Sequence, residues 1–254
     1  MEIKETIIET HRDGIQIVQY NKPNKKNATD RSMYQRVINI LNNAATDDNI
    51  TVTVLTGTGD FYSSGNDFSP AAIEETTIRN PNILKEYINA FIRFPKILIA
   101  IVNGPAIGIA ATTLALCDLV FASENSYFYT PFTKLGIVAE GCSTFTFPRL
   151  IGDRKATEML LCNHKMSAKE ALDCGFINYI YKPEDLKSQV WEKIVEVSKL
   201  PRNSVLATKK LLRDTVKKDL INTNEREMEQ LNIFDASVEK DFSILSFILN
   251  LKKY

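Results

Sequence analysis

Short apolar runs separated by polar, glycine-containing turns occupy the first two thirds of the chain. Residues 6–9 and 15–19 flank Asp13-Gly14, a dipeptide typical of the two-residue turn of a β-hairpin. Residues 97–102 are apolar without interruption, so we expect this strand to be covered on both faces of a sheet. Further strands are predicted at residues 50–55, 118–122, 127–129 and 176–181.

Apolar residues at helical spacing predict helices between these strands. Residues 30–45 carry one apolar face, residues 81–93 begin at Pro81, and residues 105–116 are apolar nearly all round, as in a buried helix. The apolar face of the first of these helices consists of Met33, Val37, Ile40 and Leu41. Residues 57–80 are rich in Gly, Ser, Thr and Pro and predict a long loop, a kind of segment that is often functional.

Two polar pairs have the spacing of a helix start. Ser167 with Glu170 forms a capping-box pattern, and Gly175 stands where that helix should end. Asn224 with Glu227 is a second start signal of the same spacing, so we expect a break in the helix just before it.

The chain changes character near residue 185, after which it is predicted to be helical with a break near Pro201. We therefore divide it into a core of strands and helices, residues 1–185, and a helical region, residues 186–254, assigned to oligomerisation and active-site closure. The apolar residues expected to dock on the core or on another subunit are Leu231, Phe234, Phe242, Leu245, Phe247, Ile248 and Leu251.

Composition excludes several function classes. The chain of 254 residues is 44% hydrophobic, and its 31 basic and 31 acidic residues cancel, so it has no electrostatic signature of nucleic-acid binding. No apolar run reaches the roughly 18 residues that a membrane span requires. The four cysteines form no C-x-x-C pair and there are two histidines, so we expect no metal site and a reducing, intracellular compartment.

Two glycine turns and one carboxylate form the candidate chemistry. Residues 63–67 and 103–109 each follow an apolar strand, and glycine lets the backbone N–H groups of such turns approach a ligand oxygen. The N–H groups of Asn66 and Ile109 are the candidate oxyanion donors. Glu140 lies in a mostly apolar segment, where loss of solvation makes a carboxylate a stronger proton acceptor.

Each feature also has a purely structural explanation. The glycine turns would then be turns only, and Glu140 would stabilise a helix N-terminus through the helix dipole. Two clusters of basic residues could contact phosphates or be solvated surface: Lys22, Lys25 and Lys26, and Lys209, Lys210 and Arg213. The residues that could line an acyl pocket or fill the core are Phe61, Phe68, Phe91, Phe94, Phe128, Phe132 and Phe145.

Several segments resemble the crotonase (enoyl-CoA hydratase/isomerase) superfamily across residues 10–185. Residues 24–28, Asn-Lys-Lys-Asn-Ala, are similar to the family's CoA-contacting segment. Residues 61–68 and 101–109 are similar to its two oxyanion loops, and residues 156–161 and 168–171 also match.

The resemblance implies an α/β fold, a spiral of ββα repeats with a helical C-terminal region, assembled as a homotrimer or a dimer of trimers. The substrate would be an acyl-CoA thioester, with CoA entering as part of the substrate and no separate cofactor or metal. The implied catalytic residues are Glu140, Asn66 and Ile109. The implied substrate contacts are Lys25, Lys26, Ser63, Ser64, Gly65, Asn66, Asp67, Phe68, Gly108, Ile109 and Phe132.

The acidic residues indicate a branch of the family. Hydratases of this family use two glutamates, and Thr112 and Phe132 stand at the matching positions. Glu140 instead matches the single glutamate of peroxisomal-type Δ3,Δ2-enoyl-CoA isomerases. We therefore expect isomerisation of 3-enoyl-CoA to 2-trans-enoyl-CoA in unsaturated fatty acid β-oxidation. A residual hydratase and a non-catalytic acyl-CoA-binding protein are the alternatives.

The resemblance implies a peroxisomal location. Residues 252–254 are not a signal of the Ser-Lys-Leu type, and we expect no acyl-CoA-binding module before the core. The mitochondrion and the cytoplasm are therefore alternative locations to the peroxisome.

Overall fold

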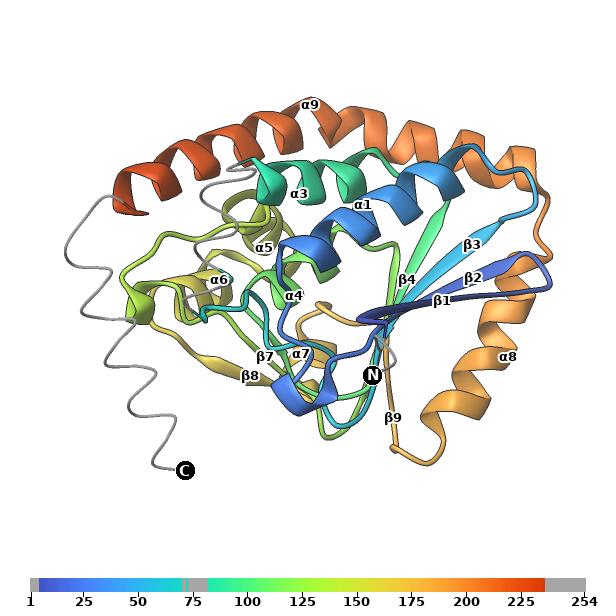
Figure 1. The fold of residues 1–254 in the computed structure, drawn as a ribbon, viewed down its shortest axis with the longest axis horizontal. Helices are drawn as coiled ribbons and strands as arrows, with labels where there is room; N and C mark the ends of the chain where they lie inside the picture. Colours follow the sequence, from blue (N-terminus) through green and yellow to red (C-terminus); the bar gives the residue numbers. More distant parts are fainter. Residues whose placement is uncertain (1–4, 70–71, 73–81, 236–254) are drawn as a thin grey trace.

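The computed structural model describes residues 5–69, 72 and 82–235 (Figure 1). Across these residues a six-stranded sheet runs in the order β1-β2-β3-β4-β6-β9, antiparallel between β1 and β2 and parallel elsewhere. Its strands are β1 Ile7–Arg12, β2 Ile15–Tyr20, β3 Val52–Gly57, β4 Ile97–Val102, β6 Leu119–Ser123 and β9 Tyr179–Tyr181. Three short strands form a second sheet: β5 Ala106–Ile107, β7 Tyr127–Tyr129 and β8 Lys165–Ser167.

Helices cover both faces of the large sheet (Figure 1). Their bounds are α1 Arg31–Thr46, α3 Ile83–Arg93, α4 Ile109–Thr112, α5 Ser143–Ile151, α6 Asp153–Leu160, α7 Ala168–Asp173, α8 Leu186–Ser198 and α9 Arg202–Asp235. Short 3-10 turns occur at Pro23–Lys25, Thr113–Leu116 and Thr133–Leu135. None of the helices in the described ranges combines the length and apolar character that a membrane crossing demands.

Neighbouring strand residues face opposite layers of the core. Val54 and Ile99 pack with α8, whereas Leu55 and Ala100 pack in the larger core with α1 and α3. This confirms that residues 97–102 are covered on both sides, because a strand buried on both faces needs an apolar side chain at every position.

The predicted hairpin and the predicted capping box are both present, and a side chain also caps α1. The hairpin between β1 and β2 turns at Asp13 and Gly14, whose φ angles of 51° and 78° suit the predicted two-residue turn. Asp30 caps α1 by accepting a hydrogen bond from the Met33 amide at 3.0 Å. The capping box of Ser167 and Glu170 is present in α7.

The predicted helix over residues 105–116 is wrong in extent. Ala106 and Ile107 form β5 and pair with β7, and the helix begins only at Ile109. Gly108 has φ 58° and ψ −128°, a conformation that no right-handed helix contains, so the backbone turns there before the helix starts.

The predicted break at residues 223–224 is also wrong, because α9 runs continuously from Arg202 to Asp235. The Asn224 side chain donates to the Lys85 carbonyl at 3.0 Å and to Asn89 Oδ1 at 3.1 Å on α3, so it does not cap its own helix. The break near Pro201 is confirmed. Leu231 is buried in the core, whereas Pro81, the Phe234 side chain and the apolar residues expected after residue 235 lie outside the described residues.

An ion-pair cluster holds the first half of α9 against the sheet. Lys209 Nζ lies 2.6 Å from Asp118 Oδ2, and Arg213 lies 2.9 Å from Asp118 Oδ1. Lys210 pairs with Asp214 on the surface. These three basic residues, considered above as phosphate contacts, therefore contact carboxylates of the protein itself.

Replacing Asp118 with Asn is expected to lower the free energy of unfolding by about 3 kcal/mol, because it leaves two partly buried cations beside each other without their counter-ion. Asp214→Asn removes an exposed pair on the same helix and should cost less than about 1 kcal/mol. Urea titration of both variants measures the difference, and equal effects would contradict a structural role for the buried cluster.

Candidate active site

A cavity of about 680 Å³ lies between the two glycine turns and the segment that leads into α5. Asn66, Gly108, Ile109 and Glu140 line it together, although they come from three distant parts of the sequence. Apolar and aromatic residues form most of the remaining wall: Ala28, Phe61, Phe68, Ile107, Tyr127, Tyr129, Pro131, Phe132, Leu135 and Ile137. The other polar lining residues are Lys26, Ser64, Asp67, Ser69 and Lys134. Such a cavity suits a ligand with a long apolar part and one polar group.

The first glycine turn is aligned by the segment before α1. The Thr29 amide donates to the Gly65 carbonyl at 2.8 Å, and the Asp67 amide donates to the Thr29 carbonyl at 3.0 Å. This parallel bridge uses the groups on either side of Asn66. The backbone N–H of Asn66 therefore points away from the bridge.

Ser63 and Asn27 support this turn from behind. The Asn27 side chain donates to the carbonyls of Thr58 and Phe61 at 2.9 and 2.8 Å. Ser63 Oγ donates to the Asn27 carbonyl at 2.8 Å and accepts from the Gly65 amide at 3.1 Å. Ser63, Gly65 and Lys25, expected above to contact substrate, do not line the cavity, and the first two are buried scaffold of the turn.

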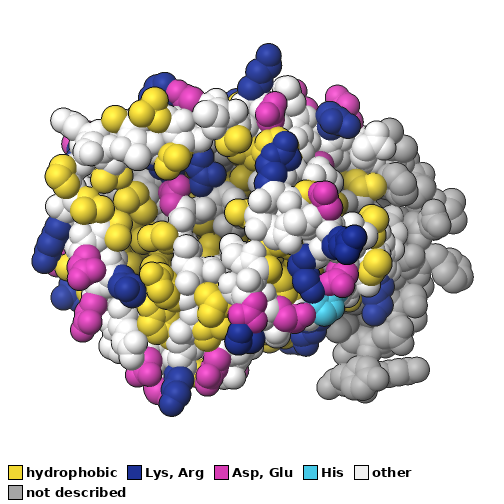
Figure 2. All heavy atoms as spheres, turned by 180° about the vertical axis from the view of Figure 1, so that it is seen from behind, with side chains coloured by type: hydrophobic (Ala, Val, Ile, Leu, Met, Phe, Trp, Pro, Cys, Tyr) yellow, Lys and Arg dark blue, Asp and Glu magenta, His cyan; other side chains and the backbone are white. Residues whose placement is uncertain are grey.

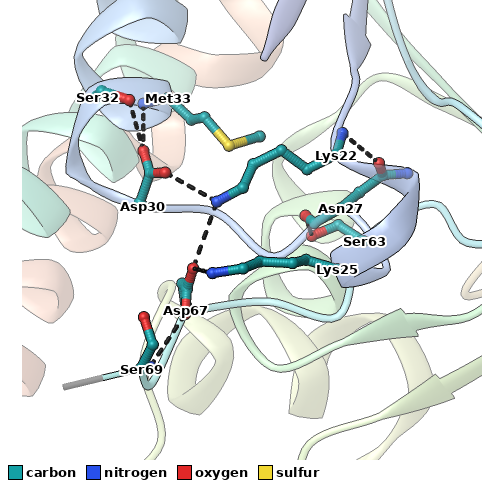
Figure 3. Close-up of polar contacts among 9 residues, drawn as sticks. All are labelled: Lys22, Lys25, Asn27, Asp30, Ser32, Met33, Ser63, Asp67 and Ser69. Atoms are coloured by element: carbon teal, nitrogen blue, oxygen red, sulfur yellow. Dashed lines mark hydrogen bonds and ion pairs between the residues drawn. The ribbon is translucent and has the colours of Figure 1, made fainter. Parts of the chain in front are cut away.

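A chain of charges anchors the residue that follows Asn66 (Figure 3). The Lys22 ammonium lies between Asp30 and Asp67, at 2.9 and 3.3 Å, and Lys25 lies 3.4 Å from Asp67. Burial alone would raise the pKa of Asp67, but hydrogen bonds from Ser69 and the charge of Lys22 bring that pKa below its ordinary value. The carboxylate therefore stays charged and holds the end of the turn.

Lys26 is placed differently from its two neighbours. It lines the cavity, and its ammonium lies over the Phe61 ring at 5.2 Å from the centroid. Of the three lysines near this turn, it is the one whose side chain lies in the cavity wall.

The second glycine turn lies directly against the first. The Ile107 amide donates to the Ser63 carbonyl at 3.0 Å, and a Cβ added to Gly65 would stand 2.5 Å from the Ile107 oxygen. Ile109 is the first residue of α4, and the first N–H groups of a helix have no partner within it. Asn66 and Ile109 therefore lie on two adjoining turns, and both line the cavity.

Glu140 is 1% exposed, and its Oε1 accepts a hydrogen bond from Asn66 Nδ2 at 3.2 Å. The alternative that it caps a helix is wrong, because α5 begins at Ser143 with Cys142 as its N-cap residue. Gly141 has φ 74°, and a Cβ there would stand 2.1 Å from Thr112 Oγ1. This close packing fixes the backbone next to Glu140.

Neither position of the hydratase glutamate pair supplies an acid. Thr112 is buried behind Gly141, where its hydroxyl donates to the Ile109 carbonyl at 3.2 Å. Phe132 is buried in the cavity wall and presents an aromatic ring. Of the candidate pocket phenylalanines, Phe61 and Phe68 also line the cavity, whereas Phe91, Phe94 and Phe128 belong to the core.

Glu227 of α9 holds the start of α5, a role that its spacing from Asn224 did not reveal. Its carboxylate accepts from the Cys142 amide at 2.7 Å and from the amide and hydroxyl of Thr144 at 3.0 and 2.6 Å. Anions are favoured at a helix N-terminus. The C-terminal helix is therefore tied to the segment that carries Glu140.

Burial raises the pKa of the Glu227 carboxyl to about 7, although its three hydrogen bonds act in the opposite direction. Because the folded state then binds this proton more tightly than the unfolded state, stability from this group is present at low pH and is lost as pH rises through about 7. We expect the free energy of unfolding to fall by up to about 3 kcal/mol between the ordinary pKa of a glutamate and the raised pKa of about 7.

The titration effect can be isolated by Glu227→Gln, which removes the ionisable group. In urea titrations between about pH 5 and pH 8, the free energy of unfolding of this variant should fall less with rising pH than that of the wild type. Glu229→Gln, at an exposed position of the same helix, should show the same pH dependence as the wild type. A slope unchanged by Glu227→Gln would contradict the assignment.

The chain is similar to proteins of one known family over most of its length. The profile of the family described as enoyl-CoA hydratase/isomerase matches residues 10–252. The chain is 42% identical to enoyl-CoA delta isomerase 2 of Rattus norvegicus, covering 97% of this chain and 64% of that protein. It is also 42% identical to the Mus musculus enoyl-CoA delta isomerase 3, peroxisomal, covering 87% of this chain and 71% of that protein.

A solved structure shows the fold. The crystal structure of an enoyl-CoA hydratase/isomerase from Pseudoalteromonas atlantica superimposes with a TM-score of 0.90 at 27% identity, covering 97% of this chain and 98% of that one. This confirms the predicted fold class. With the family profile extending from residue 10 into the C-terminal region, the chain belongs to the enoyl-CoA hydratase/isomerase family, the crotonase superfamily.

Proposed function

We propose that this chain is a Δ3,Δ2-enoyl-CoA isomerase that converts 3-enoyl-CoA to 2-trans-enoyl-CoA. The observation that carries the proposal is a buried carboxylate, Glu140, in the wall of a cavity that Asn66 and Ile109 also line. The other carboxylate of the lining, Asp67, is paired with Lys22 and Lys25. The isomerase names of the rat and mouse relatives support it. The chain spans about 64% of the length of the rat protein, so the activity is inferred from the site as well as from the relative.

In the proposed mechanism the thioester oxygen lies between the backbone N–H groups of Asn66 and Ile109. These donors stabilise the negative charge that develops on that oxygen and so acidify the C2 proton. The Glu140 carboxylate removes this proton and leaves a dienolate. The same carboxyl group then returns the proton to C4, which moves the double bond into conjugation with the thioester.

One carboxyl group is enough because isomerisation neither adds nor removes water. Hydration would need a second acid to position and activate a water molecule, and Thr112 and Phe132 occupy the positions where such an acid is expected. General acid–base catalysis of this kind contributes ~10²–10⁴-fold to the rate.

The cavity wall supports an acyl-CoA substrate. Phe68, Phe132 and Leu135 offer apolar surface for the fatty chain, and Lys26 and Lys134 add positive charge to the lining. We propose that CoA enters as part of the substrate and that no separate cofactor takes part. Lys134, Tyr127 and Tyr129 also line the cavity, and they were not predicted as site residues. The sequence around them contains no motif that indicates a place beside Glu140.

The test is a direct competition of two activities in the purified protein. Conversion of 3-enoyl-CoA, followed by the absorbance of the conjugated product, should exceed hydration of 2-enoyl-CoA at every chain length assayed. Faster hydration would favour the hydratase alternative. Tight acyl-CoA binding without conversion of either substrate would favour a non-catalytic acyl-CoA-binding protein.

We also propose a homotrimer or a dimer of trimers, with residues 186–254 contributing to assembly, and a peroxisomal location like that named for the mouse relative. Leu211 and Leu212 of α9 are 73% and 69% exposed, and hydrophobic side chains gather on one side of the back face (Figure 2). Exposed apolar surface of this kind favours association. Light scattering should give a trimer mass or twice that value, and a monomer would contradict the proposed assembly.

A further inference from the structure

Tyr34 of α1 contacts Asn66, which in turn contacts Glu140. Tyr34 is 4% exposed and is not one of the residues that line the cavity. Its ring packs on Tyr87 with centroids 4.6 Å apart. Its hydroxyl donates a hydrogen bond to Asn66 Oδ1.

The Asn66 side chain uses both ends of its amide. Oδ1 accepts from Tyr34, and Nδ2 donates to Glu140 Oε1 at 3.2 Å. A flipped amide would turn its oxygen toward the Glu140 carboxylate, which can only accept hydrogen bonds when ionised. A donor at the Tyr34 position therefore favours the orientation in which Nδ2 faces Glu140.

The surroundings keep Tyr34 a donor. Burial and, second, the negative charge of Glu140 raise the pKa of Tyr34 well above its ordinary value, so the hydroxyl retains its proton. Asp30 caps α1 one turn before Tyr34 and thereby fixes the start of the helix that carries it.

We propose that Tyr34 is a positioning residue that orients Asn66, so that one residue presents its side-chain amide to Glu140 and its backbone N–H to the substrate. The inference rests on the proposed function of Glu140 as the proton shuttle. It assigns the Asn66 side chain and backbone to two roles in the same reaction, the orientation of Glu140 and the stabilisation of the thioester oxygen.

Tyr34→Phe removes the hydroxyl and keeps the ring on Tyr87. We expect the kcat for isomerisation to fall about tenfold with KM changed less than about twofold, since a hydrogen bond to the catalytic pair is lost while the cavity wall is unchanged. The acidic limb of the kcat–pH profile should move to higher pH, because Glu140 loses a well-oriented donor to its charged form.

Other ionisable groups around Glu140 remain in place in this variant. Those in the cavity lining are Lys26, Asp67, Lys134, Tyr127 and Tyr129. Those behind the wall include Glu227, which binds the backbone of the segment after Glu140, the Asp30 carboxylate, whose charge raises the pKa of Tyr34, and the neighbouring Tyr20 phenol. Any displacement of the acidic limb must therefore be compared with a control that removes a neighbouring hydroxyl.

Tyr87→Phe is the matched control. The Tyr87 hydroxyl bonds to the Tyr20 hydroxyl at 2.7 Å in the same buried cluster, whereas the hydrogen bond to Asn66 Oδ1 comes from Tyr34. This variant should keep the wild-type kcat and pH profile. A double-mutant cycle adds the second test: in an Asn66→Ala background, which keeps the backbone N–H, Tyr34→Phe should cause no further loss.

Two outcomes would overturn the inference: equal kcat and pH profiles for Tyr34→Phe and Tyr87→Phe, or an undiminished effect of Tyr34→Phe in the Asn66→Ala background. Both leave the proposed function intact if Glu140→Gln is inactive. An active Glu140→Gln variant would instead remove the proposed function itself, whatever the behaviour of Tyr34.

Discussion

Replacing Glu140 with Gln is expected to reduce isomerisation of 3-enoyl-CoA by ~10²–10⁴-fold, the contribution typical of a general acid–base group. The amide has the shape of the carboxyl group but cannot accept the C2 proton. The buried position at the cavity wall and the hydrogen bond from Asn66 make this the largest single effect that we expect on activity. Steady-state rates with 3-enoyl-CoA measure it.

The same variant should still fold and bind. Gln is nearly isosteric with Glu, and the apolar wall formed by residues such as Phe132 and Leu135 is unchanged. Calorimetric binding of a saturated acyl-CoA and the urea midpoint serve as controls, and both should stay close to wild type. Isomerisation at a rate near that of the wild type would exclude Glu140 as the proton shuttle.

Replacing Gly65 with Ala should have the second largest effect. The added Cβ would stand 2.5 Å from the Ile107 carbonyl oxygen, at the contact between the two glycine turns. The turns must move apart, which separates the amides of Asn66 and Ile109. Loss of one oxyanion donor lowers kcat by ~10²–10³-fold, and we expect a loss in this range.

Gly152→Ala is the control that distinguishes the steric collision of an added Cβ from the strain of a positive φ angle. Gly152 has φ 77°, close to the 84° of Gly65, but a Cβ there meets nothing within 4 Å, and it does not line the cavity. Both variants should lose ~1–3 kcal/mol of stability through an unfavourable backbone conformation. Only Gly65→Ala should lose activity, as measured by kcat at a temperature where both are folded. Equal kcat values would contradict a tightly joined pair of turns.

The parts of the fold that follow from neighbouring residues could be predicted. The hairpin at Asp13-Gly14 and the capping box of Ser167 and Glu170 depend on interactions within a few residues, so the local sequence contains the information. The two failures have distant causes. Residues 106–107 pair with β7, and the Asn224 side chain binds α3. Neither partner can be recognised from the local pattern.

The same distinction holds in the candidate site. Glycine turns and a lone glutamate in an apolar segment are visible in the sequence, and the family resemblance assigns Asn66, Ile109 and Glu140 to one site. Tyr34 and Glu227 gave no comparable signal, because each acts through a residue far away in the sequence. Lys25 and Lys26 are neighbours with the same chemistry, yet one lies in an ion pair and the other lines the cavity.

By itself, the sequence determined the strand and helix periods, the glycines that permit positive φ, and the lone glutamate of an apolar segment. These are properties of short segments and residue types. Only the tertiary structure decided that Asn66, Ile109 and Glu140 line one cavity, that Ser63 and Gly65 lie behind its wall, and which side chains orient the carboxylate. The physical reason is that strands distant in sequence pair in one sheet. This pairing brings two turns together, although the local sequence of neither turn indicates that the other lies beside it.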